Sequence, residues 1–146
     1  MKRREKRTVD YVFGALFQVG ILLAINSWPL WIPFTFGVVT PAYEQVVWAA
    51  NLAAVVKLLQ CVWLAFTRPE WLLHLTRMLV GVANVISTLA FIAVFPFNFS
   101  VFAGPWMNPL VRGAMLLAVL VTLIQVLVSA ARFIFNGPNR RLPAGG

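Results

Sequence analysis

The sequence has 146 residues, of which 61% are hydrophobic and only 11% charged, and its mean hydropathy is +0.85. This composition excludes an ordinary soluble domain and indicates an integral membrane protein. Twelve basic residues against four acidic ones give a formal charge of +8. Because the basic residues gather at the ends of apolar segments, we expect a lipid bilayer as partner and no nucleic acid. The single cysteine, Cys61, excludes an intramolecular disulfide and a CxxC redox pair.

Four apolar segments are long enough to cross the hydrocarbon core, which takes roughly 20 helical residues. In chain order they cover residues 11–31, 46–66, 72–95 and 110–135. Stretches containing proline or glycine separate them, as expected of connectors. We therefore predict an all-α integral membrane protein, a bundle of four transmembrane helices with short loops and antiparallel neighbours. Residues 1–10 would form a basic segment before this 11–135 domain, and residues 136–146 a short basic tail.

Charge placement predicts the orientation, because cytoplasmic flanks of membrane helices carry the lysines and arginines. The start "MKRREKR", the turn with Arg68 and the tail from Arg132 onward would share one side, whereas the two aromatic loops contain no basic residue. We expect a multi-pass protein of the cell (inner or plasma) membrane with both termini in the cytoplasm. A cleavable signal peptide is the alternative, but the first run continues through Ile25 without a clear small-x-small cleavage site.

Tryptophans stand near the ends of the predicted helices, where an amphipathic ring is favoured. Membrane anchors are therefore predicted at Trp28, Trp31, Trp48 and Trp106 on the outer side, and at Trp63 and Trp71 on the inner side.

Residues suited to catalysis are scarce. All four acidic residues lie outside the apolar cores, and the only histidine, His74, cannot provide paired axial ligation of a haem or a zinc cluster. We expect His74 and Arg77 to be polar residues of the inner interface, satisfied by headgroups or water; a haem or chlorophyll held by His74 alone is the alternative. The sequence thus predicts no enzyme, no cofactor and no metal. A proton-coupled exporter is also disfavoured, because such proteins usually need a membrane-embedded carboxylate.

Lys57 is the exception to this apolar pattern, since it lies about 14 Å of helix from Phe66 and so near mid-membrane. A charged lysine there costs about 2.5 to 3.5 kcal/mol on insertion scales. It can snorkel toward the inner headgroups past Gln60, be held neutral by burial, or meet an acidic group of another chain or a lipid. Together with Asn51, Gln60 and Asn84, it forms the candidate intramembrane polar site.

Other polar and small residues within the helices favour helix association. Amides such as Gln18, Asn26 and Gln125 seek partners across helix interfaces, and alanine or serine pairs four residues apart allow close approach. We therefore expect a non-catalytic membrane subunit or accessory protein that binds partner helices or lipids. The alternative is a small homo-oligomeric transporter or pore with Lys57 on a polar path.

Overall fold

A computed structural model describes residues 2–67 and 69–135 of the chain. The described residues form α1 (Lys2–Asn26), α2 (Trp28–Trp31), η1 (Ile32–Thr35), η2 (Pro41–Val46), α3 (Val47–Phe66), α4 (Glu70–Val94), α5 (Ser100–Ala103) and α6 (Met107–Phe135). Four helical stretches are long and apolar enough to cross a membrane, namely Arg7–Asn26, Pro41–Phe66, Glu70–Val94 and Met107–Phe135. For the described residues, the predicted all-α fold with four segments long and apolar enough to span a membrane is confirmed.

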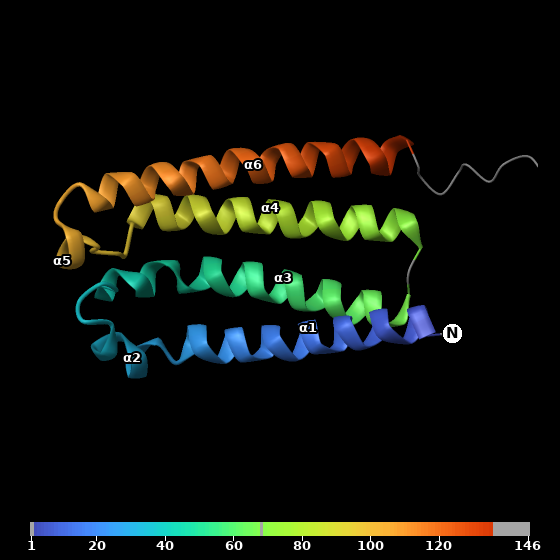
Figure 1. Cartoon of the computed structure of the whole chain (residues 1–146), viewed down its shortest axis with the longest axis horizontal. Helices are drawn as coiled ribbons and strands as arrows, with labels where there is room; N and C mark the ends of the chain where they lie inside the picture. Colours follow the sequence, from blue (N-terminus) through green and yellow to red (C-terminus); the bar gives the residue numbers. More distant parts are fainter. Residues whose placement is uncertain (1, 68, 136–146) are drawn as a thin grey trace, which may run out of the picture.

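The four long helices lie side by side in a row that is one helix thick (Figure 1). Helix α1 packs on α3, α3 on α4 and α4 on α6, so that neighbours in the chain are antiparallel neighbours in space. Helix α1 begins and α6 ends at the same end of the row, here called the termini end; α2 and α5 lie at the opposite, loop end. The arrangement is thus an open bundle, and no described helix covers either face of the row.

Helix ends differ by several residues from the predicted spans. Helix α1 begins at Lys2, within the predicted basic segment, because lysine, arginine and glutamate are good helix formers. It ends at Asn26, and Ser27 separates it from α2, which has Pro29 in its first turn. Helix α6 begins at Met107, three residues before the predicted span. The predicted tail at residues 136–146 lies outside the described residues.

Small residues set the distances between neighbouring helices. A Cβ at Gly81 of α4 would overlap the Val126 side chain of α6, and a Cβ at Gly14 of α1 would lie 3.2 Å from the Cys61 Sγ of α3. Cys61 itself is buried. These contacts show that α1 and α3, and α4 and α6, approach closely where one helix has no side chain.

The two connectors at the loop end bind each other. An isolated antiparallel bridge joins Val39 to Phe97. The Thr40 amide donates to the Pro96 carbonyl at 2.8 Å, and the Asn98 amide donates to the Val38 carbonyl at 2.6 Å. Aromatic rings continue this contact from one connector to the other, through Trp28, Trp31, Tyr43, Phe91, Phe97, Phe95 and Phe99. The connectors therefore form one aromatic cap over the loop end of the row.

Candidate functional site

Three long helices line a cleft in the half of the row nearer the termini end. Its volume is about 450 Å³. We call it the polar cleft; its charged and hydrogen-bonding residues are Lys57 and Gln60 of α3, Arg77 and Asn84 of α4, and Thr122, Gln125, Ser129 and Arg132 of α6. None of the described residues that line it is acidic. The cleft therefore combines three basic side chains with amides and hydroxyls, without a carboxylate to balance them.

Helical spacing places these side chains on one face. Arg77, Gly81 and Asn84 follow one another at intervals of four and three residues along α4, and residues at such intervals share a helix face. Gln125, Ser129 and Arg132 repeat the same intervals on α6. These two sets of side chains lie next to each other because α4 and α6 approach closely at Gly81, where Val126 of α6 packs directly on α4.

Lys57 is half-buried and belongs to a chain of hydrogen bonds that crosses from α3 to α4. Its Nζ donates to Gln60 Oε1 at 2.7 Å, and Gln60 Nε2 donates to Thr76 Oγ1 at 3.3 Å. The Thr76 hydroxyl donates in turn to the Leu73 carbonyl at 3.2 Å. Gln60 and Thr76 are both buried. Since Gln60 lies one turn nearer the termini end, the lysine side chain is directed toward that end, which is the direction that snorkelling requires.

Register between the helices brings the three basic residues to similar heights. The Gln60–Thr76 hydrogen bond aligns α3 with α4, and the Gly81–Val126 contact aligns α4 with α6. With a rise of about 1.5 Å per residue, the backbones of Lys57, Arg77 and Arg132 differ in height by no more than about 6 Å, measured parallel to the helix axes. The three side chains therefore line the same part of the cleft from three helices, with α4 between α3 and α6.

The polar surface continues past Lys57 toward α1. A second hollow, with a volume of about 360 Å³, lies among α1, α3 and α4. It shares Lys57, Val80 and Asn84 with the polar cleft and extends to Gln18 of α1. Lys57 therefore stands where the two hollows meet, and all four long helices contribute to this face.

Three amides on this face lack hydrogen-bonding partners within the described part of the chain. They belong to the side chains of Gln18, Asn84 and Gln125. Asn84 and Gln125 are exposed and Gln18 is half-buried, and none of the three side chains bonds to another described residue. Each lies well inside a helix long and apolar enough to cross a membrane, and in a membrane-spanning helix such a position has little access to water.

Asn51 lies apart from the polar cleft. Asn26 Nδ2 donates to Asn51 Oδ1 at 2.9 Å, and Asn51 Nδ2 donates back to Asn26 Oδ1 at 3.1 Å. This reciprocal pair joins α1 to α3 toward the loop end. Of the four residues in the candidate intramembrane site, the structure thus brings Lys57, Gln60 and Asn84 to one cleft and gives Asn51 a partner elsewhere.

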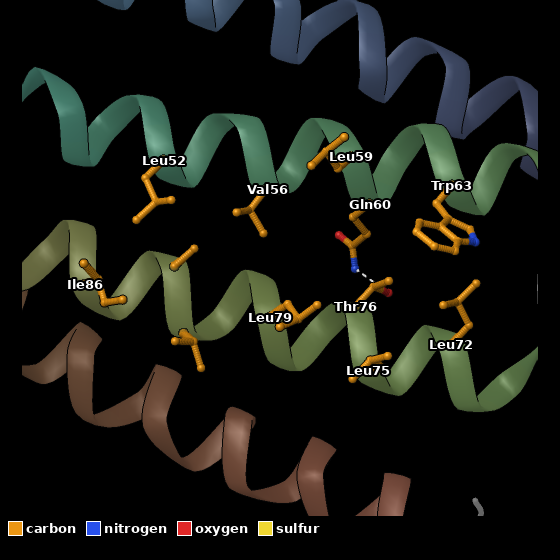
Figure 2. Close-up of a pocket in the computed structure, with 12 residues that line it drawn as sticks. Leu52, Val56, Leu59, Gln60, Trp63, Leu72, Leu75, Thr76, Leu79 and Ile86 are labelled. Carbon is orange, nitrogen blue, oxygen red and sulfur yellow. Dashed lines mark hydrogen bonds between the residues drawn. The ribbon is translucent and has the colours of Figure 1, made fainter. Parts of the chain in front are cut away.

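An apolar groove with a volume of about 430 Å³ occupies the opposite face between α3 and α4. Figure 2 shows leucine side chains from both helices along it, among them Leu52, Leu59 and Leu79, and shows the Gln60 amide directed at Thr76. Lys57 and Leu59 are two residues apart and so point about 200° apart around α3. The row consequently has one polar face and one apolar face.

The remaining predicted residues lie near helix ends. His74 is half-buried one turn into α4 and is not among the residues that line the polar cleft, whereas Arg77 is. Trp28 and Trp31 pack around Tyr43 in the aromatic cap, and the Trp31 indole donates to the Ala24 carbonyl at 2.6 Å. The other tryptophans lie on the surface, with Trp48, Trp63 and Trp106 more than half exposed and Trp71 half-buried.

Sequence reasoning did not assign the α6 residues Gln125, Ser129 and Arg132 to the site. Their intervals of four and three residues were a usable signal, because they mark one polar stripe on an otherwise apolar helix. Gln18 of α1 was recognised as polar but was also left outside the candidate site.

The arrangement offers positive charge and hydrogen-bonding groups. No group of three or more histidine, cysteine, aspartate or glutamate side chains that could hold a metal ion occurs among the described residues. Arginine and lysine side chains attract anions, and the free amides can donate and accept hydrogen bonds. Comparison of the chain with protein-family models, with curated proteins and with solved structures gives no match.

Proposed function

We propose that this chain is a non-catalytic multi-pass membrane subunit or accessory protein whose polar face binds a helix of a partner membrane protein. The observation that carries the proposal is the set of amides at Gln18, Asn84 and Gln125, which are without partners inside membrane-crossing helices. An amide in hydrocarbon is costly unless it is hydrogen-bonded. A partner helix on this face would satisfy these groups, each bond contributing roughly 0.6 to 2 kcal/mol.

The distribution of acidic residues supports a binding role. Asp10 lies in the first half of α1, Glu44 in η2 and Glu70 at the start of α4, so these three do not converge on the polar cleft. General acid–base catalysis requires positioned groups within hydrogen-bonding reach of one substrate. The basic cleft provides positive charge and hydrogen bonds, which are the means of recognition rather than of proton transfer.

Both termini are proposed to lie in the cytoplasm, with the protein in the cell (inner or plasma) membrane. The basic residues of the described helices gather toward the termini end, where Arg7, Arg77 and Arg132 lie, whereas Arg112 is near the loop end. Cytoplasmic flanks are enriched in such residues. This orientation would turn the aromatic cap outward and the end of the polar cleft that carries Arg77 and Arg132 toward the cytoplasmic leaflet.

The test is extraction of the tagged full chain from its native membrane into nanodiscs, followed by native mass spectrometry. We expect a defined heteromer, and we expect an Asn84→Leu/Gln125→Leu double variant to recover about tenfold less partner. Gln45→Leu is the matched control, since Gln45 is an exposed amide in η2 outside the polar cleft. Recovery of the wild-type chain as a monomer, or equal partner recovery by the double variant, would contradict the proposal.

A homo-oligomeric transporter or pore is the second candidate, and the continuity of the polar face favours it. The polar cleft and the adjoining hollow meet at Lys57, so two copies packed on this face would enclose a path lined by Lys57, Gln60 and Asn84. The expected signs are a homo-oligomer without other chains and anion flux into proteoliposomes that Lys57→Leu abolishes. Absence of flux, or flux unchanged by this substitution, would exclude the pore.

A further inference from the structure

The termini-end part of the polar cleft has the charge of an anion site. Lys57, Arg77 and Arg132 line it from three different helices, and no acidic side chain is among its described lining residues. Arginine remains charged in proteins and presents a planar fork that matches the oxygen atoms of a phosphate group. Three like charges at similar heights repel one another, so a bound anion would stabilise their arrangement.

Gln60 orients one of these charges. Its side-chain oxygen accepts from the Lys57 ammonium at 2.7 Å, and its nitrogen is committed to Thr76 at 3.3 Å, so the amide is held in one orientation. The lysine side chain is thereby directed toward the level of Arg77. One ammonium proton is used by Gln60, which leaves two for an anion.

The position of the site in the helices corresponds to the lipid headgroup region. Helix α6 has 29 residues and is therefore about 43 Å long, which exceeds the roughly 30 Å hydrocarbon core. Arg132 lies three residues before the last residue of α6, or about 4.5 Å from that end. If α6 spans the membrane, its guanidinium can reach the phosphate level of the leaflet at the termini end, and Arg77 and Lys57 follow at greater depth.

The helices around this charged end suit acyl chains. Toward the loop end the lining includes Val80 and Ile124 beside the polar side chains of Asn84, Thr122 and Gln125, and all three lining helices are long and apolar enough to cross a membrane. A charged end on a helix that also exposes Ile124, Leu127 and Val128 matches an amphiphile better than a small soluble anion.

We infer that the polar cleft binds one anionic phospholipid, whose phosphate group contacts Arg77, Arg132 and the Lys57 ammonium and whose acyl chains lie against Val80 and Ile124. This inference goes beyond the proposed partner helix, because the lipid site uses the basic end of the cleft and needs no second protein. Bound there, the lipid supplies the negative charge that the chain itself does not place near Lys57.

The experiment titrates the purified, delipidated full chain with phosphatidylglycerol or phosphatidylcholine and reads bound lipid by native mass spectrometry. We expect one phosphatidylglycerol per chain in preference to phosphatidylcholine, and Arg77→Gln and Arg132→Gln each to weaken this binding about tenfold. Arg112→Gln is the matched control, because the Arg112 guanidinium lies 4.4 Å from the centre of the Phe95 ring near the loop end. Each variant must elute and melt like the wild-type chain.

Two further arms make the result decisive. In one arm, inorganic phosphate is titrated into the full chain held in phosphatidylcholine nanodiscs. If phosphate binds saturably and this binding depends on Arg77 and Arg132, while the chain does not retain phosphatidylglycerol, the cleft is a soluble-anion site. That result would overturn the lipid assignment. Equal retention of the two lipids, or retention that the two arginine variants leave unchanged, would also overturn it. Partner recovery with Asn84→Leu/Gln125→Leu is measured separately, so failure of the lipid site and failure of the proposed partner are distinguishable.

Discussion

Lys57 lies inside a helix long and apolar enough to cross a membrane, where an isolated charge would be unfavourable, and its neighbours determine how it is accommodated. Gln60 accepts from the ammonium and is fixed by Thr76, so the lysine side chain is directed one turn toward the termini end. An amide acceptor does not neutralise the charge, but it replaces part of the lost hydration. The remaining hydration or counter-charge must come from outside the described chain, because no acidic side chain lines the cleft.

Gly81 provides a test of packing at the residue scale. A Cβ at this position would overlap Val126, so Gly81→Ala should push α4 from α6 and lower stability by about 1 to 3 kcal/mol, as overpacking does. Gly20→Ala is the matched control, because a Cβ there meets nothing within 4 Å and alanine favours the helix. Thermal unfolding of the full chain in detergent measures the difference. A Gly81→Ala protein as stable as the Gly20→Ala protein would show that α4 and α6 are not so closely packed.

At the scale of elements, the aromatic cap ties two connectors that are far apart in the sequence. Phe97 is its central ring, stacked on Phe91 at 5.8 Å between ring centres and in contact with Phe95 and Phe99. The bridge between Val39 and Phe97 adds backbone pairing. The cap therefore holds α1 and α3 on one side to α4 and α6 on the other at the loop end.

Phe97→Ala should loosen this cap. Each aromatic pair contributes about 0.5 to 1.5 kcal/mol beyond its buried area, so loss of three pairs should lower the melting temperature measurably and speed amide exchange in both connectors. Phe102→Ala is the control, because Phe102 is 69% exposed. Hydrogen exchange by mass spectrometry reads both connectors in one experiment. Faster exchange confined to the connector that contains residue 97 would contradict a shared cap.

Hydropathy predicted the elements well because membrane helices are marked by length and apolarity alone. The span at residues 46–66 and the α3 helix end at the same residue, and Glu70 begins α4 two residues before its predicted span. Helix ends that lie in polar segments were harder to predict. Helix α1 starts at Lys2, before the apolar run, because the charged residues there are good helix formers and extend the helix. Such residues carry no hydropathy signal for a helix.

The site was less predictable than the elements, since it depends on which helix faces are adjacent. Lys57 was identifiable as a lone charge, and Gln60 as its neighbour one turn away. Asn51 resembled them in type and depth, yet it pairs with Asn26, and α6 supplies Arg132 instead. In a membrane both faces of a helix can be apolar, so periodicity does not tell which face meets which neighbour.

At the scale of the whole molecule, the open row separates two kinds of surface. Lys57, Asn84 and Gln125 lie on one face, and the apolar groove with Leu52 and Leu79 lies on the other. A closed bundle would bury polar groups in its centre, whereas a row one helix thick leaves them at its surface (Figure 1). Lipid acyl chains can solvate the apolar face without a protein partner. The polar face is therefore the surface through which this chain is expected to recognise its partners.

Orientation in the membrane decides which leaflet the polar cleft faces, and single-cysteine labelling can determine it. In a Cys61→Ser background, which removes the buried native thiol, Phe102→Cys reports the loop end and Thr67→Cys the termini end; both positions are exposed. Because basic residues are retained on the cytoplasmic side, a membrane-impermeant maleimide should label Phe102→Cys in intact cells and label Thr67→Cys only after permeabilisation. The opposite pattern would place Arg77 and Arg132 in the outer leaflet and overturn the proposed orientation. With the expected pattern, these arginines would face the cytoplasmic leaflet, whose anionic lipids carry the phosphate groups that the cleft is inferred to bind.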